Sequence, residues 1–163
     1  MWSPGLMHVR IDDRMIHGQV AVYWCRFVGA TRIMVANDEM HSNEIQKAAL
    51  RMVVPPGLRS SLLDVETAAA NLSSGKYAGQ RVILVVRRPS DILRMLDAGV
   101  GIEAVNVGNL PAREGTVTVK NSIDVTPEEL DQLRELDARG VHLTGKQVPD
   151  NSDEDLMVYI NRL

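Results

Sequence analysis

Val82-Ile83-Leu84-Val85-Val86 is the stretch of sequence that decides the fold. All five residues are apolar and four of them are β-branched, a composition typical of strands. A strand without polar alternation needs cover on both of its faces, which is the situation of central strands in parallel sheets. The run therefore predicts a buried strand at the centre of a sheet that carries helices on both sides.

Strand patterns alternate with helical patterns on both sides of this run. Besides 82–86, we predict strands at residues 7–11, 32–36, 58–63, 104–107, 116–120, 122–125 and 141–144. The predicted helices have apolar stripes, most of them after a cap residue: Ile16, Val20, Tyr23, Trp24 and Phe27; Ile45, Ala48, Ala49 and Met52 after Ser42; Val65, Ala68, Ala69 and Leu72 after Asp64; Ile92, Leu93 and Leu96 after Ser90; Leu130, Leu133 and Leu136 after Thr126; Leu156, Met157 and Ile160 after Ser152. This alternation predicts an α/β fold, a single layered α-β-α domain with a mostly parallel central sheet. The two strands at 116–125 are so close in sequence that we expect one antiparallel edge strand.

Length and composition limit the interpretation further. The chain has 163 residues, 45% of them apolar, and a formal net charge of -3. This length favours one domain, expected at residues 7–163, with residues 1–6 as an N-terminal extension or an expression remnant. The sequence has no basic block, no apolar run of membrane-spanning length and no recognisable signal peptide, so we expect a cytoplasmic protein without nucleic-acid partners. The single cysteine, Cys25, excludes an internal disulfide and is expected to be a small core residue.

The stretch Arg10-Ile11-Asp12-Asp13-Arg14-Met15-Ile16-His17-Gly18-Gln19-Val20 joins the first strand to the first helix. A helix start presents backbone N–H groups without intrahelical partners and the positive end of the helix dipole, so it stabilises an anion. We expect His17 in the first helical turn, where it can hold such an anion covalently. Gly18 lets the backbone approach a phosphate oxygen, and Gln19 belongs to the same anion-binding turn.

The charged residues before His17 suit a phosphoryl group. Arginine forks form bidentate, charge-assisted hydrogen bonds with phosphate oxygens, so we predict that Arg14 and Arg10 contact the phosphate. Asp12 and Asp13 can hold these arginines or fix the imidazole tautomer, and we assign the orienting role to Asp13. The stretch therefore predicts a histidine that takes up a phosphoryl group and passes it on.

Other polar residues follow predicted strands, and ligands of open α/β sheets bind at the carboxyl ends of strands. Arg87 and Arg88 come directly after the strand 82–86, where they are either surface charges or border the phosphate crevice. Asn106, Gly108 and Asn109 form a turn at the end of the next strand and are further crevice candidates.

The string R-I-D-D-R-M-I-H-G-Q-V resembles the phosphorylation site of the IIB components of the mannose/fructose/sorbose-type sugar phosphotransferase system, whose pattern is R-I-D-x-R-L/M-I-H-G-Q-V. The similarity extends from Met7 onward, through a V-x-N-D-E turn that includes Asp38, the turn at 105–109 and the stretch 145–149. Asp38 is for this reason added to the crevice candidates.

The resemblance implies a bacterial phosphocarrier, a transferase at the inner face of the membrane. A IIA component donates the phosphoryl group from its own phosphohistidine to Nδ1 of His17, and Arg14 contacts the phosphate. The sugar that is phosphorylated enters through the membrane components IIC and IID. No metal and no cofactor are implied, and the sugar and a homo-oligomeric state stay open.

Three alternatives are weighed against this hypothesis. Histidine phosphatases also use a histidine followed by glycine at the end of a first strand, but they need an arginine where Ile16 stands. A metal enzyme would have to use Asp12, Asp13 and His17, a poor ligand spacing. A non-catalytic regulatory or binding module of the same fold would have no chemical need for His17, Gly18 and Arg14 together.

Overall fold

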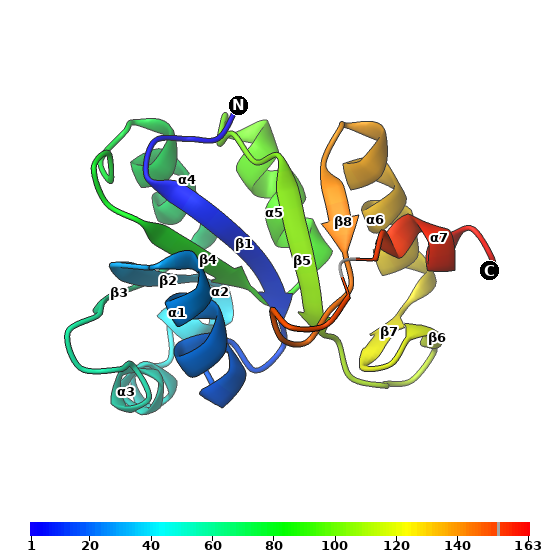
Figure 1. Cartoon of the computed structure of the whole chain (residues 1–163), viewed down its shortest axis with the longest axis horizontal. Coiled ribbons are helices and arrows are strands. Elements are labelled where there is room, and N and C mark those ends of the chain that lie inside the picture. The colour runs from blue at the N-terminus through cyan, green and yellow to red at the C-terminus, as the bar shows by residue number, and fades with distance from the viewer. Residues whose placement is uncertain (153) are drawn as a thin grey trace.

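The structure is a computed structural model that describes residues 1–152 and 154–163, and it is built on a six-stranded sheet. All neighbouring strands are parallel, in the order β3-β2-β4-β1-β5-β8 (Figure 1). The strands of this sheet are β1 (Leu6–Asp12), β2 (Arg32–Ala36), β3 (Arg59–Leu63), β4 (Val82–Val86), β5 (Ala104–Asn109) and β8 (His142–Thr144). The strand β4 lies between β1 and β2 and is buried along its whole length, which confirms the prediction of a central buried strand.

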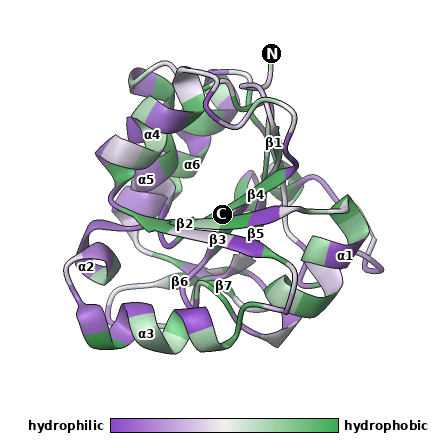
Figure 2. Ribbon diagram, turned by 90° about the vertical axis from the view of Figure 1, so that its left-hand side faces the viewer, coloured by the Kyte–Doolittle hydropathy of each residue, from purple (hydrophilic) through white to green (hydrophobic). Residues whose placement is uncertain are grey.

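Helices cover both faces of the sheet, so the α-β-α architecture is confirmed (Figure 2). One layer contains α4 (Val65–Ser73), α5 (Pro89–Asp97), α6 (Pro127–Ala138) and α7 (Leu156–Ile160). The other contains the π-helix η1 (Gln19–Trp24), α1 (Cys25–Val28), α2 (Asp38–His41) and α3 (Glu44–Met52).

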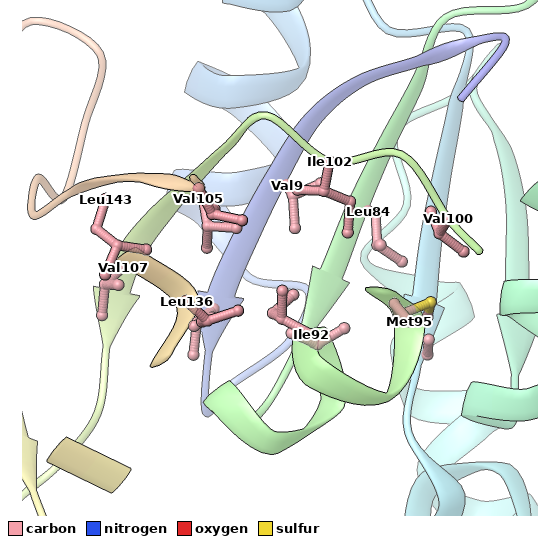
Figure 3. Packing of buried hydrophobic residues seen from close by; sticks show 14 of the residues in the cluster. Val9, Leu84, Ile92, Met95, Val100, Ile102, Val105, Val107, Leu136 and Leu143 are labelled. Carbon is pink, nitrogen blue, oxygen red and sulfur yellow. The ribbon is translucent and has the colours of Figure 1, made fainter. Parts of the chain in front are cut away.

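The alternation of side chains along β4 divides the core into two clusters. Val82, Leu84 and Val86 face the layer of α4 and α5, whereas Ile83 and Val85 face the layer of η1 and α2. Figure 3 shows Ile92 and Met95 of α5 on the same side of the sheet as Leu84. Each face of the central strand is therefore sealed by its own helices, which explains why polar residues are missing from it.

The prediction of an antiparallel strand at the edge of the main sheet is wrong about where that strand lies. β6 (Val117–Lys120) and β7 (Ile123–Val125) are antiparallel, but they form a separate two-stranded sheet. Only two residues separate them, and Ser122 adopts a positive φ of 68°, so the pair closes locally as a hairpin.

One predicted apolar stripe faces the core only in part, since Ile16, Val20 and Trp24 are buried, and a second one does not face it. Tyr23 and Phe27 are 55% and 65% exposed, because Gln19–Trp24 forms a π-helix, whose wider turn shifts the buried face. In α3, Ile45 and Met52 are each 86% exposed. The buried contacts of that region come instead from Leu50 and from Met40 of the preceding helix α2.

Three predicted helix caps lie at other residues. The N-caps are Asn43, Arg88 and Asp155, in place of Ser42, Ser90 and Ser152. The amide oxygen of Asn43 and the carboxylate of Asp155 accept hydrogen bonds from N–H groups in the first turns of α3 and α7. The helix α5 has no side-chain cap and begins at Pro89.

At the N-terminus, β1 begins at Leu6, one residue before the predicted start. Before it, Ser3 exchanges hydrogen bonds with Gly101. Cys25 is buried as expected, and burial raises the pKa of its thiol to about 11.

Thr126 forms the predicted capping box at the start of α6 with Glu129. Its hydroxyl accepts a hydrogen bond from the backbone N–H of Glu129 at 3.1 Å. We expect Thr126→Ala to lower the free energy of unfolding by about 1 kcal/mol. Asp131→Ala, at an exposed position of the same helix, serves as control and is expected to change stability by less than about 0.5 kcal/mol. Equal values for the two variants in urea denaturation would contradict a stabilising cap.

Candidate active site

The candidate active site lies in the loop that connects β1 to η1, at the carboxyl end of β1. Because β4 and β5 are parallel to β1 and hydrogen bonded to it on either side, their carboxyl ends reach the same edge of the sheet (Figure 1). The loop is anchored by the buried side chains of Met15 and Ile16, and Met15 adopts a left-handed φ of 61°. A non-glycine residue in this conformation is held there by its surroundings, so the loop has a defined shape.

His17 lies two residues before η1, so the prediction that it lies in the first helical turn is wrong. Its carbonyl oxygen accepts the first helical hydrogen bond, from the backbone N–H of Ala21 at 2.8 Å. Its Nε2 lies 2.6 Å from Oδ2 of Asp12, and its side chain is 14% exposed. A carboxylate can only accept a hydrogen bond, so this contact places the imidazole proton on Nε2.

In the neutral imidazole, the lone pair then lies on the other ring nitrogen, Nδ1. Among residues 1–152 and 154–163, no group forms a hydrogen bond with Nδ1. An unprotonated and unbonded imidazole nitrogen is a nucleophile.

Asp12 is fully buried and collects four hydrogen bonds. Its Oδ2 accepts from Nε of Arg10 at 3.1 Å and from Nδ2 of Asn109 at 2.9 Å, in addition to His17. Its Oδ1 accepts from the backbone N–H of Arg14 at 3.0 Å. Burial raises the pKa of Asp12, but the hydrogen bond from His17, the charge of Arg10 and the hydrogen bond from Asn109 outweigh it, so the pKa lies below its ordinary value.

Asp13 does not orient His17, and the prediction that it does is wrong. Successive side chains at the end of a strand point to opposite sides, so only one of the two aspartates can face the imidazole. Asp13 instead binds Nη2 of Arg87 at 2.9 Å and Nη1 of Arg88 at 2.8 Å. The structure thereby places Arg87 and Arg88 at the border of the crevice, bound to the active-site loop.

Arg14 and Gly18 are the exposed residues of the loop around His17. In the part of the chain that the structure describes, the guanidinium of Arg14 takes part in no hydrogen bond or ion pair. A pocket next to it is lined by Asp13, Arg14, Asn109, Pro111 and Ser122. No atom lies within 4 Å of the place where Gly18 would carry a Cβ, so the backbone there is open to a ligand.

Arg10 cannot bind phosphate, contrary to the prediction, because its side chain is completely buried. It passes beneath Gly108, whose missing Cβ would overlap the guanidinium. Gly108 is therefore required for the packing of Arg10 and not for close approach to a phosphate. Asn106 is likewise buried and accepts a hydrogen bond from Nη1 of Arg10.

Two more predicted residues lie differently from the expectation. Asp38 binds the backbone N–H of Val65 at 3.0 Å and the guanidinium of Arg94 at 2.8 Å, so it joins α2 to α4 and α5. Gln19 begins η1, but its side-chain oxygen is buried and turned away from solvent. Its first-turn position is the only feature that suits the predicted role in phosphate binding.

The sequence interpretation missed the contribution of Trp24 and of the loop after β8. Nε1 of Trp24 donates to the carbonyl of Gln147 at 2.8 Å, and Nη1 of Arg10 donates to the carbonyl of Lys146 at 3.1 Å. The side chain of Gln147 donates to the carbonyl of Gly108. The only sequence signal for this loop was the match of residues 145–149 to the family pattern.

Within residues 1–152 and 154–163, no helix is both long and apolar enough to cross a bilayer. The same residues contain no group of three or more His, Cys, Asp or Glu side chains placed to hold a metal ion.

Comparisons with known proteins agree on one family. Residues 6–163 match the family described as PTS system sorbose subfamily IIB component. The fructose-specific EIIB component of Bacillus subtilis (strain 168) is 33% identical over 154 residues, which is 94% of each protein. The crystal structure of the IIBSor domain of the sorbose permease from Klebsiella pneumoniae superposes with a TM-score of 0.91 at 31% identity, over 96% of each chain.

The chain also spans about half the length of a further group of relatives. The mannose-specific EIIAB component of Escherichia coli (strain K12) is 36% identical over 154 residues, which is 94% of this chain and 48% of the relative. The α/β fold is that of a phosphotransferase-system domain. The chain belongs to the family of IIB components of the mannose/fructose/sorbose-type sugar phosphotransferase system.

Proposed function

We propose that this chain is a histidine phosphocarrier that accepts a phosphoryl group on Nδ1 of His17 and transfers it to a sugar. The observation that carries the proposal is the 2.6 Å contact of Nε2 with the buried carboxylate of Asp12, which leaves Nδ1 as the nucleophilic nitrogen. The donor is a phosphohistidine of a IIA component, and the acceptor sugar arrives through the membrane components IIC and IID. The chain works at the cytoplasmic side of the membrane, where these components meet it.

The two transfer steps balance without a redox partner. In the first, the lone pair of Nδ1 forms a bond to phosphorus while the phosphorus–nitrogen bond of the donor histidine breaks and its imidazole leaves. In the second, a sugar hydroxyl oxygen attacks phosphorus, its proton goes to solvent, and Nδ1 of His17 regains its lone pair. Asp12 stabilises the positive charge that the imidazole carries between the two steps, as the carboxylate of a catalytic triad does.

Phosphoryl transfer passes through a loose transition state whose charge lies on the equatorial oxygens. Arg14, exposed beside the loop and unpaired within the described residues, is placed to bind these oxygens. The backbone N–H groups of Gly18 and Gln19, at the positive end of the helix, are further donors for these oxygens. Positioning and fixed charge are thus supplied by the chain's own groups.

The relatives point to the class of sugar. Those described above are named for mannose, fructose and sorbose, all of which are hexoses. A hexose or hexose derivative is accordingly the proposed acceptor for this chain.

A reconstituted relay tests the proposal. With labelled phosphoenolpyruvate, the general phosphotransferase proteins and a IIA component, the wild-type chain is expected to acquire acid-labile label. His17→Ala is expected to acquire none, because the accepting nitrogen is gone. His142→Ala, at an exposed position of β8, is the matched control and is expected to label like the wild type. Label on His17→Ala at another residue would contradict the proposal.

A further inference from the structure

Arg10 is a positive charge in the interior of the protein, and the proposed reaction gives it no direct part. Its side chain is 0% exposed, and its guanidinium lies 5.4 Å from the ring centre of Trp24. Burying an unpaired charge is strongly unfavourable, so a buried arginine requires partners that match its hydrogen-bonding fork. The partners of Arg10 are the carboxylate of Asp12, which contacts His17, the side chain of Asn106 and the carbonyl of Lys146.

The fork of Arg10 connects three segments of the chain. Nε donates to Oδ2 of Asp12 at 3.1 Å on one side. On the other side, Nη1 donates to Oδ1 of Asn106 and to the carbonyl of Lys146. Gly108 leaves the room that the guanidinium occupies. These contacts on both sides hold the guanidinium of Arg10 in one direction, and the guanidinium in turn orients the carboxylate of Asp12.

The same oxygen of Asp12 binds both Arg10 and His17. We infer that Arg10 is a positioning residue for the proposed reaction: it keeps the carboxylate of Asp12 charged and aimed at Nε2, and thereby keeps the lone pair on Nδ1 of His17. This inference rests on the proposed function, in which Nδ1 is the accepting atom.

The chemistry without Arg10 shows why the charge matters. A buried carboxyl group that lacks a positive partner tends to take up a proton. A protonated Asp12 could donate its own hydrogen to Nε2, and the imidazole would then carry its proton on Nδ1. That tautomer has no lone pair on the nitrogen that must attack phosphorus.

His8, the third titratable residue of β1 beside Arg10 and Asp12, does not replace Arg10. His8 stacks on Trp24 with ring centres 4.5 Å apart, and burial together with the charge of Arg10 lowers its pKa to about 3. His8 is therefore neutral near pH 7, and Arg10 is the charged group in direct contact with Asp12 on the buried side.

The first measurement is the tautomer of His17, by ¹⁵N NMR of the imidazole in the full chain without any donor. The wild type is expected to carry the proton on Nε2. Arg10→Gln removes the charge and is expected to shift the population toward the Nδ1–H form. Arg10→Lys keeps the charge without the fork and is expected to restore the Nε2–H form in part. Gly108→Ala displaces the guanidinium without removing a polar group and is expected to act like Arg10→Gln.

The second measurement is the rate at which His17 reacts with phosphoramidate. This small donor transfers its phosphoryl group to Nδ1 while its phosphorus–nitrogen bond breaks and ammonia leaves. Arg10→Gln and Gly108→Ala are expected to slow the reaction by about tenfold or more, the usual effect of losing a hydrogen bond to a charged group. The maximal rate should fall, with little change in the phosphoramidate concentration that gives half of it.

Arg32→Gln is the matched control. Arg32 also makes two side-chain hydrogen bonds and lies 5.2 Å from an aromatic ring centre, that of Tyr77, but it stands at the opposite end of its strand from the site. It is expected to leave both the tautomer and the rate unchanged. Thermal unfolding shows whether each variant is folded. If Arg10→Gln is not folded, Gly108→Ala and Arg10→Lys test the positioning role in its place.

The outcomes separate the inference from the proposed function. An unchanged tautomer and rate in folded Arg10→Gln and Gly108→Ala would overturn the positioning role. Reduced rates with the tautomer unchanged would also overturn it, since a general structural effect would then suffice. If wild-type His17 itself did not react while the tautomer shifted as expected, the proposed function would fail and the role of Arg10 in fixing the imidazole would stand.

Discussion

Asp12→Asn is expected to slow phosphorylation of His17 by about 10³- to 10⁴-fold, the size of effect seen when the carboxylate of a catalytic triad becomes an amide. The amide can present N–H to Nε2, which moves the imidazole proton to Nδ1 and removes the attacking lone pair. The rate is measured with the IIA donor in single-turnover experiments. Asp38→Asn, a carboxylate bound to Val65 and Arg94 away from His17, is the control and should keep the wild-type rate. A loss of less than about tenfold in Asp12→Asn would show that the carboxylate does not set the tautomer.

The same substitution is expected to lower the free energy of unfolding by about 3 to 5 kcal/mol, because it leaves the buried charge of Arg10 without its ionic partner. The pH dependence follows from the lowered pKa of Asp12. A carboxylate with a depressed folded pKa stabilises the protein above its unfolded pKa of about 3.9, and this contribution is lost as the pH falls through the folded value. The difference in stability between wild type and Asp12→Asn should therefore be constant near pH 7 and shrink in acid.

Arg14→Ala is expected to slow phosphoryl transfer by about 10²- to 10³-fold, as for removal of a single group that stabilises transition-state charge. Its guanidinium is exposed and forms no contact that holds the described part of the fold, so stability should change by less than about 0.5 kcal/mol. Arg14→Lys keeps the charge but not the planar fork, and an intermediate rate is expected.

Arg134→Ala, on α6 in the layer that covers the other face of the sheet, controls for the loss of an arginine in general. Its rate of transfer should equal that of the wild type. Equal rates for Arg14→Ala and Arg134→Ala would remove Arg14 from the proposed reaction.

Much of the fold was predictable because its signals are local. The run Val82–Val86 predicts its own burial, and the Thr126 capping box predicts the start of α6. The exposure of Tyr23 and Phe27 was not predictable from an α-helical period, because the chain there forms a π-helix. One antiparallel edge strand was expected from the proximity of β6 and β7, but the separation of this pair from the main sheet depends on distant strands.

The site was predictable in place and only partly in detail. The motif around His17 marks the loop, and parallel strands bring Asn109 and the arginines after β4 to it. Which aspartate faces the imidazole depends on the direction of each side chain at the strand end, which the sequence leaves open. The burial of Arg10 depends on Gly108 and on the carbonyl of Lys146, groups about a hundred residues or more away in the chain. A charged residue in a strand of alternating polarity is expected to face solvent, because the sequence does not show which distant groups will bury it.

The strand order has a consequence for synthesis of the protein. β1 leaves the ribosome before the other strands of the sheet, yet its neighbours are β4 and β5, which emerge much later. The carboxylate of Asp12 has no Asn109 beside it, and Arg10 has no Lys146 carbonyl, until the nascent chain has grown past these positions. An unfinished chain thus carries His17 and Asp12 before the distant groups that fix the direction of the Asp12 carboxylate have been made.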